Sequence, residues 1–239
     1  MRPLIGLVSF ALLAGLSMPA FAGTVSIAGH GEVTASPDTA FVTSGVTTQG
    51  ASAREALDLN TKAMADLLAE LKASGIAERD VQTSGFSVSP NYVYTEERDA
   101  NGYTLPPKIN GYQVSNTVTV RVRALDTLGA ILDKSVTVGA NTINGVSFSV
   151  SDPSELLNEA RKAAFADARA KAELYATAAG AKLDDIVSIN EGQDIGQPQP
   201  YMFKDMAAAA PRADVPIAAG ELSFAINVSV QWDLEDAGK

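Results

Sequence analysis

The chain has 239 residues, with 28 acidic side chains against 18 lysines and arginines, one histidine and no cysteine. The net charge of −10 argues against nucleic acid or an anionic membrane surface as the partner, because both select clustered positive charge. Without cysteine, disulfide bonds and thiol chemistry are excluded, so an exported chain of this kind must depend on its core for stability.

The first residues have the pattern of a secretory signal peptide. Arg2 supplies a positive start, residues 4–16 form an apolar run, and residues 20–22 give the small-x-small pattern of a cleavage site. The apolar run is shorter than the roughly 20 residues that span a bilayer. We therefore predict cleavage between Ala22 and Gly23, export to the periplasm, and no transmembrane segment in the mature chain.

The first half of the mature chain is predicted to hold four strands and one long helix. Ser52 and Glu55 form a capping box that opens the helix, and Gly75 suits its left-handed end. Residues 95–110 are acidic and contain Gly and Pro, which predicts a loop. Alternation of apolar and polar residues predicts strands at residues 24–36, 38–50, 81–94 and 111–123.

The second half continues with two helices and three strands. A short helix is expected to begin at its cap Asp126 and to end at Gly139. A longer helix is expected to begin after the cap Asp152 and to end at Gly180, and its buried stripe is mostly alanine, which predicts close approach to its neighbour. The predicted strands occupy residues 144–151, 185–190 and 221–232.

These elements predict an α+β fold, with mainly antiparallel sheets, two long helices and one short helix. Period-2 alternation gives each strand one apolar face, which we expect the helices to cover. Residues 23–239 are interpreted as a single domain. Both halves follow a strand–helix–strand–strand order, so we also predict an internal duplication, with pseudo-repeats at about residues 38–123 and 142–233.

The sequence contains few candidate catalytic residues. His30 is the only histidine, and the glycines on either side of it indicate a bulge or a close backbone approach with the imidazole at the surface. The cluster of Glu96, Glu97 and Asp99 lacks the regular ligand spacing of a calcium loop and is interpreted as part of a turn. We predict no catalytic residue, no metal site and no cofactor.

One loop is more apolar than its position predicts. Between residues 197 and 211, four large side chains interrupt a segment rich in Pro and Ala, namely Tyr201, Met202, Phe203 and Met206. These side chains either pack back on the core of their own chain or form an adaptable contact for a partner or another copy. The sequence leaves both interpretations open.

Three stretches of the sequence resemble the SIMPL-domain family. They are GHGEVTASPDTAFVTSGV near the mature start, INGYQVSNTVTVRVRALDTLGAILDKSVTVGANTINGVSFSVSD in the middle, and GAKLDDIVSINEG after the alanine-rich helix. Bacterial members of that family include periplasmic immunogenic proteins and proteins described as oxidative stress defence proteins. The resemblance implies a strand–helix core and a tendency to form higher oligomers, and it brings no catalytic residues with it.

The sequence therefore predicts an exported, non-enzymatic protein of the bacterial cell envelope that assembles with itself or binds another envelope protein, with support of oxidative stress defence implied by the resemblance. Long strands such as 111–123 and 221–233 would favour a homo-oligomer if they lay at open sheet edges. The alternative is a hydrolytic enzyme of unknown substrate that uses His30 or carboxylates. A small-ligand binding module is a third alternative, which only a pocket in a structure can support.

Overall fold

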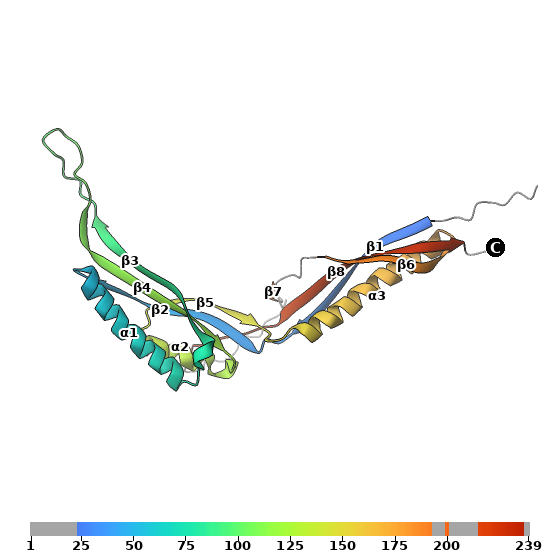
Figure 1. Ribbon diagram of the computed structural model, residues 1–239, viewed down its shortest axis with the longest axis horizontal. Helices are drawn as coiled ribbons and strands as arrows, with labels where there is room; N and C mark the ends of the chain where they lie inside the picture. Colours follow the sequence, from blue (N-terminus) through green and yellow to red (C-terminus); the bar gives the residue numbers. More distant parts are fainter. Residues whose placement is uncertain (1–22, 193–198, 201–214, 237–239) are drawn as a thin grey trace, which may run out of the picture. The chain divides into compact units, whose positions relative to one another are not determined.

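A computed structural model describes residues 23–192, 199–200 and 215–236 (Figure 1). The predicted α+β class is confirmed: three helices accompany two antiparallel sheets in the described part of the chain. The helices are α1 (Ala53–Ala73), α2 (Leu128–Thr137) and α3 (Ser154–Ala178). The strands are β1 (Gly23–Ala35), β2 (Thr39–Gly50), β3 (Val81–Val93), β4 (Lys108–Val122), β5 (Thr142–Ser149), β6 (Ala181–Glu191), β7 (Gln199–Pro200) and β8 (Leu222–Asp236).

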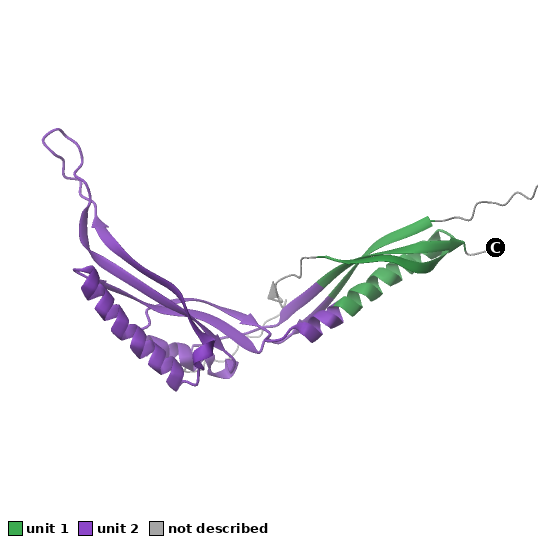
Figure 2. Ribbon diagram, viewed as in Figure 1, with its two compact units in different colours: residues 1–31, 161–194, 226–239 green, residues 32–160, 195–225 purple. Residues whose placement is uncertain are grey.

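The chain divides into two compact units (Figure 2). Unit 1 comprises residues 1–31, 161–194 and 226–239, and unit 2 comprises residues 32–160 and 195–225, so the boundary falls within β1, α3 and β8. One sheet has the strand order β3-β4-β2-β5 and the other β1-β8-β6, with β7 paired to β8. The strands β4 and β8, which the sequence marked as candidate edges, are therefore interior strands.

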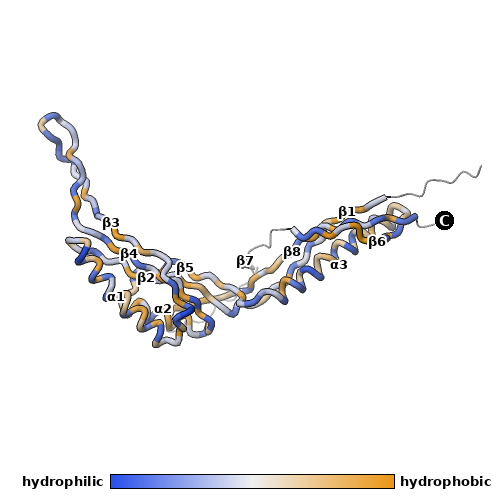
Figure 3. The backbone as a smooth tube through the Cα atoms, in the orientation of Figure 1, coloured by the Kyte–Doolittle hydropathy of each residue, from blue (hydrophilic) through white to orange (hydrophobic). Residues whose placement is uncertain are grey.

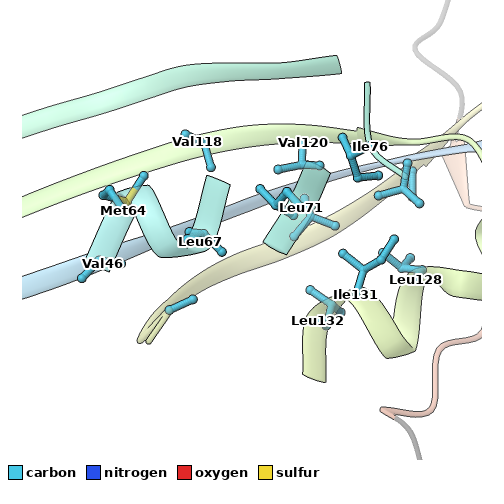
Figure 4. Packing of buried hydrophobic residues seen from close by; sticks show 14 residues of the cluster. Val46, Met64, Leu67, Leu71, Ile76, Val118, Val120, Leu128, Ile131 and Leu132 are labelled. Carbon is cyan, nitrogen blue, oxygen red and sulfur yellow. The ribbon is translucent and has the colours of Figure 1, made fainter. Parts of the chain in front are cut away.

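The sheet of unit 2 has one apolar face, which α1 and α2 cover (Figure 1). Antiparallel pairing places Val42 opposite Val120 and, on its other side, opposite Val146, so that apolar side chains line up on this face. Leu67 and Leu71 of α1 are almost fully buried against the sheet, and Leu128 of α2 joins them. Figure 4 shows how these side chains interlock into the core of unit 2.

The ends of α1 follow the predicted signals. The backbone N–H of Glu55 donates to Ser52 Oγ at 3.2 Å, while Glu55 Oε2 accepts from the N–H of Ala51 at 2.9 Å. Gly75 follows the helix with a φ of +88°, in the left-handed region that favours glycine. The capping box and the glycine stop are thus confirmed.

The prediction that Asp126 caps the short helix is wrong. Residues Leu125–Thr127 form a 3-10 turn, and α2 begins directly after it with Thr127 at the N-cap position and no side-chain cap. The hydroxyl of Thr127 donates to the carbonyl of Ala124 at 2.8 Å, which stabilises the turn. A local backbone turn has replaced the side-chain cap that the sequence suggested.

Unit 1 packs its helix close to its sheet through small side chains. Ala164, Ala168 and Ala172 of α3 are fully buried. A Cβ atom added to Gly29 of β1 would lie 2.0 Å from the carbonyl oxygen of Ala164 and 2.7 Å from the Cβ of Ala168. The predicted close approach of the alanine helix is confirmed, and so is the close backbone approach beside His30. Hydrophobic residues recur along the strands and long helices of both units (Figure 3).

The two sheets share a strand order that bears on the predicted duplication. In their sheet, β1, β8 and β6 occupy the positions that β2, β4 and β3 occupy in the other sheet, and α3 corresponds to α1. However, β1 takes the place that the predicted second repeat assigned to β5, and β5 pairs with β2 in the other sheet. The duplication itself stays a prediction.

Candidate functional site

His30 lies exposed on β1, as expected, among contacts with α3 and β8. Its Nδ1 lies 2.9 Å from Asn227 Oδ1, and its backbone N–H donates to Asp167 Oδ2 at 2.8 Å. Lys171 Nζ donates to the same carboxylate oxygen at 2.6 Å. The hydrogen bonds from Lys171 and from the His30 backbone hold the pKa of Asp167 below its usual value. These contacts tie three elements of unit 1 together.

The acidic loop forms a turn, as predicted. Asp99 Oδ1 accepts from the N–H groups of Asn101 and Tyr103, each at 2.9 Å, and Gly102 has a φ of +84°. The Asp99 carboxylate therefore serves as a turn acceptor. Across residues 23–192, 199–200 and 215–236, no group of three or more His, Cys, Asp or Glu side chains could hold a metal ion.

The hairpin that carries this turn extends beyond its sheet. Pairing of β2 with β4 ends at Gly50 opposite Tyr112, whereas β3 and β4 remain paired as far as Val93 opposite Lys108. We call residues 90–110 the hairpin arm (Figure 1). Its large exposed side chains are Tyr92, Val93, Tyr94, Tyr103 and Ile109, with exposed fractions between 49% and 79%.

The strand β3 leads into this arm and forms one edge of the sheet of unit 2. Its 13 residues include no charged side chain. Phe86 and Val88 pair across to Asn116 and Val114, and they are 57% and 42% exposed. An exposed edge of this kind offers a row of backbone donors and acceptors to another strand.

An apolar depression lies beside this edge, on the side of α1. It has a volume of about 530 Å³, and its apolar lining comes from Leu68 and Ile76 on the helix side and Val81 and Val118 on the strands. The charged residues Lys72 and Glu78 also line it. Leu68 is 42% exposed although it belongs to the sheet-facing half of the helix. The edge strand thus presents apolar side chains together with its unpaired backbone.

The edge strands of the two sheets differ in the number of charged side chains they carry. β5, the second edge of the sheet in unit 2, also has no charged residue among its eight. In the sheet of unit 1, the edge strand β6 carries Lys182, Asp184, Asp185 and Glu191. Charged side chains on an edge discourage pairing with a further strand. Only the sheet of unit 2 lacks this protection on both edges.

The contact loop predicted from the sequence lies largely outside the described residues. Tyr201, Met202, Phe203 and Met206 lie outside the described residues, as does Ala22 of the predicted cleavage site. The sequence identified residues 81–94 as a strand, but it did not identify them as an edge. The sequence feature that could have indicated the exposed edge was the absence of Lys, Arg, Asp and Glu from that segment. No helix in the described part of the chain is both long and apolar enough to cross a membrane.

Comparison with known proteins places the chain in one family. Residues 25–232 match the SIMPL family, described as a protein of unknown function (DUF541). The chain is 41% identical over 236 residues to the 26 kDa periplasmic immunogenic protein of Brucella melitensis biotype 1. The alignment covers 94% of this chain and 93% of that protein. It is 28% identical over 208 residues to the uncharacterized protein YggE of Escherichia coli K12. That alignment covers 87% of this chain and 81% of YggE. The chain belongs to the SIMPL family.

Proposed function

We propose that this chain is a non-enzymatic periplasmic protein that assembles with copies of itself through the edge strand β3. The observation that carries the proposal is an exposed edge of 13 residues without a single charge. Natural edge strands are commonly blunted by charges, bulges or proline. β3 has register shifts between Thr83 and Gly85 and between Pro90 and Tyr92, but it carries no charge between them. An edge left uncharged beside exposed Phe86 and Val88 has the composition of a contact surface.

The occupant that fits best is a second copy of the same chain. At a net charge of −10, two copies repel each other at long range, which favours contact through a surface without acidic side chains. Both edges of the sheet in unit 2 are charge-free. Pairing of β3 with β3 gives a two-fold dimer, whereas pairing of β3 with β5 of the next copy is head-to-tail and gives a ring or a filament.

The periplasmic part of the proposal rests on the relatives and on the first residues. The Brucella relatives are named as periplasmic proteins, and the predicted cleavage would leave Gly23, the first residue of β1, at the N-terminus. A supporting role in oxidative stress defence could not act through thiols, because the chain has no cysteine to oxidise.

The test is the mass of the mature chain in solution, measured by size exclusion with light scattering at micromolar concentration. The native chain should have the mass of an oligomer. Val88→Lys places a charge in the middle of the edge and should lower the mass to that of a smaller species or a monomer. The matched control is Val187→Lys on the charged edge β6, where the native valine is 50% exposed, and it should leave the mass unchanged.

Two results would contradict the proposal. A native chain that is monomeric at micromolar concentration removes self-assembly altogether. An oligomer whose mass survives Val88→Lys places the interface elsewhere, and deletion of residues 199–209 then tests the contact loop predicted from the sequence.

A further inference from the structure

A group of arginines gathers on the face of the unit 2 sheet that α1 and α2 leave uncovered. The register places Arg121 of β4 opposite Phe41 of β2, and Gln82 of β3 opposite Thr119 of β4. Arg79 from the 3-10 turn before β3 and Arg123, the residue directly after β4, join them. Together with Asp80, these residues line a depression of about 230 Å³.

The depression is positively charged although the chain as a whole is acidic. Three guanidinium groups face one lining carboxylate, that of Asp80, which leaves an excess of two positive charges. Asp38, whose carboxylate accepts hydrogen bonds from Thr39 and Ser151, also acts on Arg123 through its charge and reduces this excess. In a chain with a net charge of −10, such a local excess is suited to an anion.

The arginines are held in place before any ligand binds. Arg123 donates from Nε and Nη2 to the two oxygens of Asp80, at 3.0 and 2.8 Å, which uses two of its five N–H donors. The guanidinium carbon of Arg121 lies 5.8 Å from the centre of the Phe41 ring, within the range of a cation–π contact. Side chains fixed in this way lose little conformational freedom on binding.

Arg121 still has unused hydrogen-bonding capacity. Its Nε is buried and has no hydrogen-bond partner among the described residues. A buried donor without a partner is unfavourable by itself and is expected to be satisfied by water or by a ligand. Because this Nε is buried, an oxyanion in the depression would accept from the terminal Nη groups of Arg121, and Gln82 and Thr119 would add an amide and a hydroxyl.

We propose that this depression, the arginine site, binds a small oxyanion with about two negative charges, of which phosphate is the simplest. Among the lining residues the guanidinium groups outnumber the carboxylate by two, which suits a phosphate group with roughly 1.5 to 2 negative charges at neutral pH. The volume of about 230 Å³ has room for a small anion with bound water. A short dicarboxylate has the same charge and is the second source of this chemistry.

The experiment is calorimetric titration of the mature chain with inorganic phosphate, and separately with succinate, at constant low ionic strength. The native chain should bind at least one of the two anions saturably at one site, and the tighter anion identifies the chemistry. Arg121→Gln should weaken that binding about tenfold, as expected for the loss of a charged hydrogen-bonding partner. Arg79→Gln, in an exposed turn, should weaken it about threefold.

The matched control is Arg169→Gln, an exposed arginine of α3 that pairs with Glu173. It lowers the net charge by the same amount and should leave binding unchanged. Circular dichroism reports whether Arg121→Gln folds, and Arg79→Gln provides a second variant if it does not. Binding that is absent for both anions, or equal in all variants, overturns the proposal. If Arg121→Gln instead changes the mass of the oligomer while neither anion binds, the arginines are a protein contact and the proposal is also overturned.

Discussion

Units 1 and 2 each cover a sheet with a long helix, and they do so with side chains of opposite size. In unit 2, α1 buries Leu67 and Leu71 against the strands. In unit 1, α3 buries a stripe of alanines against β1, where only glycine fits at position 29. A core of large side chains is damaged most by removing atoms, whereas a close approach is damaged most by adding them. The comparison therefore predicts opposite sensitivities in the two units.

The largest effect is expected from truncating the core of unit 2. Leu67→Ala should lower the free energy of unfolding by about 3 to 4 kcal/mol, because it leaves a cavity under α1 in addition to the lost burial. Urea unfolding followed by far-UV circular dichroism measures this change. The control is Leu59→Ala on the same helix, where the leucine is 50% exposed and the loss should stay below about 1 kcal/mol. Equal losses in the two variants would refute the assigned core.

The next effect comes from adding one methyl group in unit 1. Gly29→Ala should lower the free energy of unfolding by about 2 to 3 kcal/mol, because its Cβ meets the backbone of α3. The only tryptophan, Trp232, lies in unit 1 with its ring 6.2 Å from that of Phe165, so its fluorescence reports the transition in urea. Gly192→Ala serves as the control, since its added Cβ would lie 3.5 Å from the nearest atom. Similar midpoints for both variants would mean that the helix does not approach β1 this closely.

A smaller effect is expected at the ion pair of unit 2. The hydrogen bonds from Arg123 hold the pKa of Asp80 below its usual value, and the Asp80 side chain is only 7% exposed. A lowered pKa in the folded state means that the pair stabilises the fold above the unfolded pKa of about 3.9, and that this contribution is lost as the pH falls through the folded value.

Asp80→Asn should therefore lower the free energy of unfolding by about 1 kcal/mol at pH 7, a value reduced for the 47% exposure of Arg123. The difference from the native chain should shrink as urea unfolding is repeated below pH 4. Asp133→Asn on α2 is the control, because its carboxylate has no hydrogen bond or ion pair with the described residues. A difference that stays constant down to pH 2 would show that the pair is not responsible.

Local signals in the sequence predicted much of the secondary structure, and tertiary pairing explains what they missed. The capping box at Ser52 and Glu55 and the stop at Gly75 depend on neighbours within a few residues, so they could be read directly. Whether a strand lies at an edge depends on partners far along the chain, and alternation alone does not encode it. For this reason the exposed edge at β3 was not identified.

The arginine site also depends on strand pairing that the sequence alone does not reveal. Arg121 and Arg123 alternate within one strand, so the sequence placed them on the same polar face. Arg79 and Asp80 reach them only because β3 pairs with β4 in the observed register, with Val81 opposite Val120. Composition indicated an acidic chain without clustered positive charge, and the cluster exists only in the folded sheet.

The order of the strands also sets the order in which the two sheets can be completed during synthesis. The sheet β3-β4-β2-β5 has all its strands once residue 149 has been made. The strand β1 is the first described strand of the chain, yet its neighbour is β8, and His30 meets Asn227 across 197 residues. Contacts so distant in sequence form slowly, and domains at the N-terminal side of a growing chain fold first. The first described strand therefore cannot pair within its sheet until β8, the last described strand, has been made.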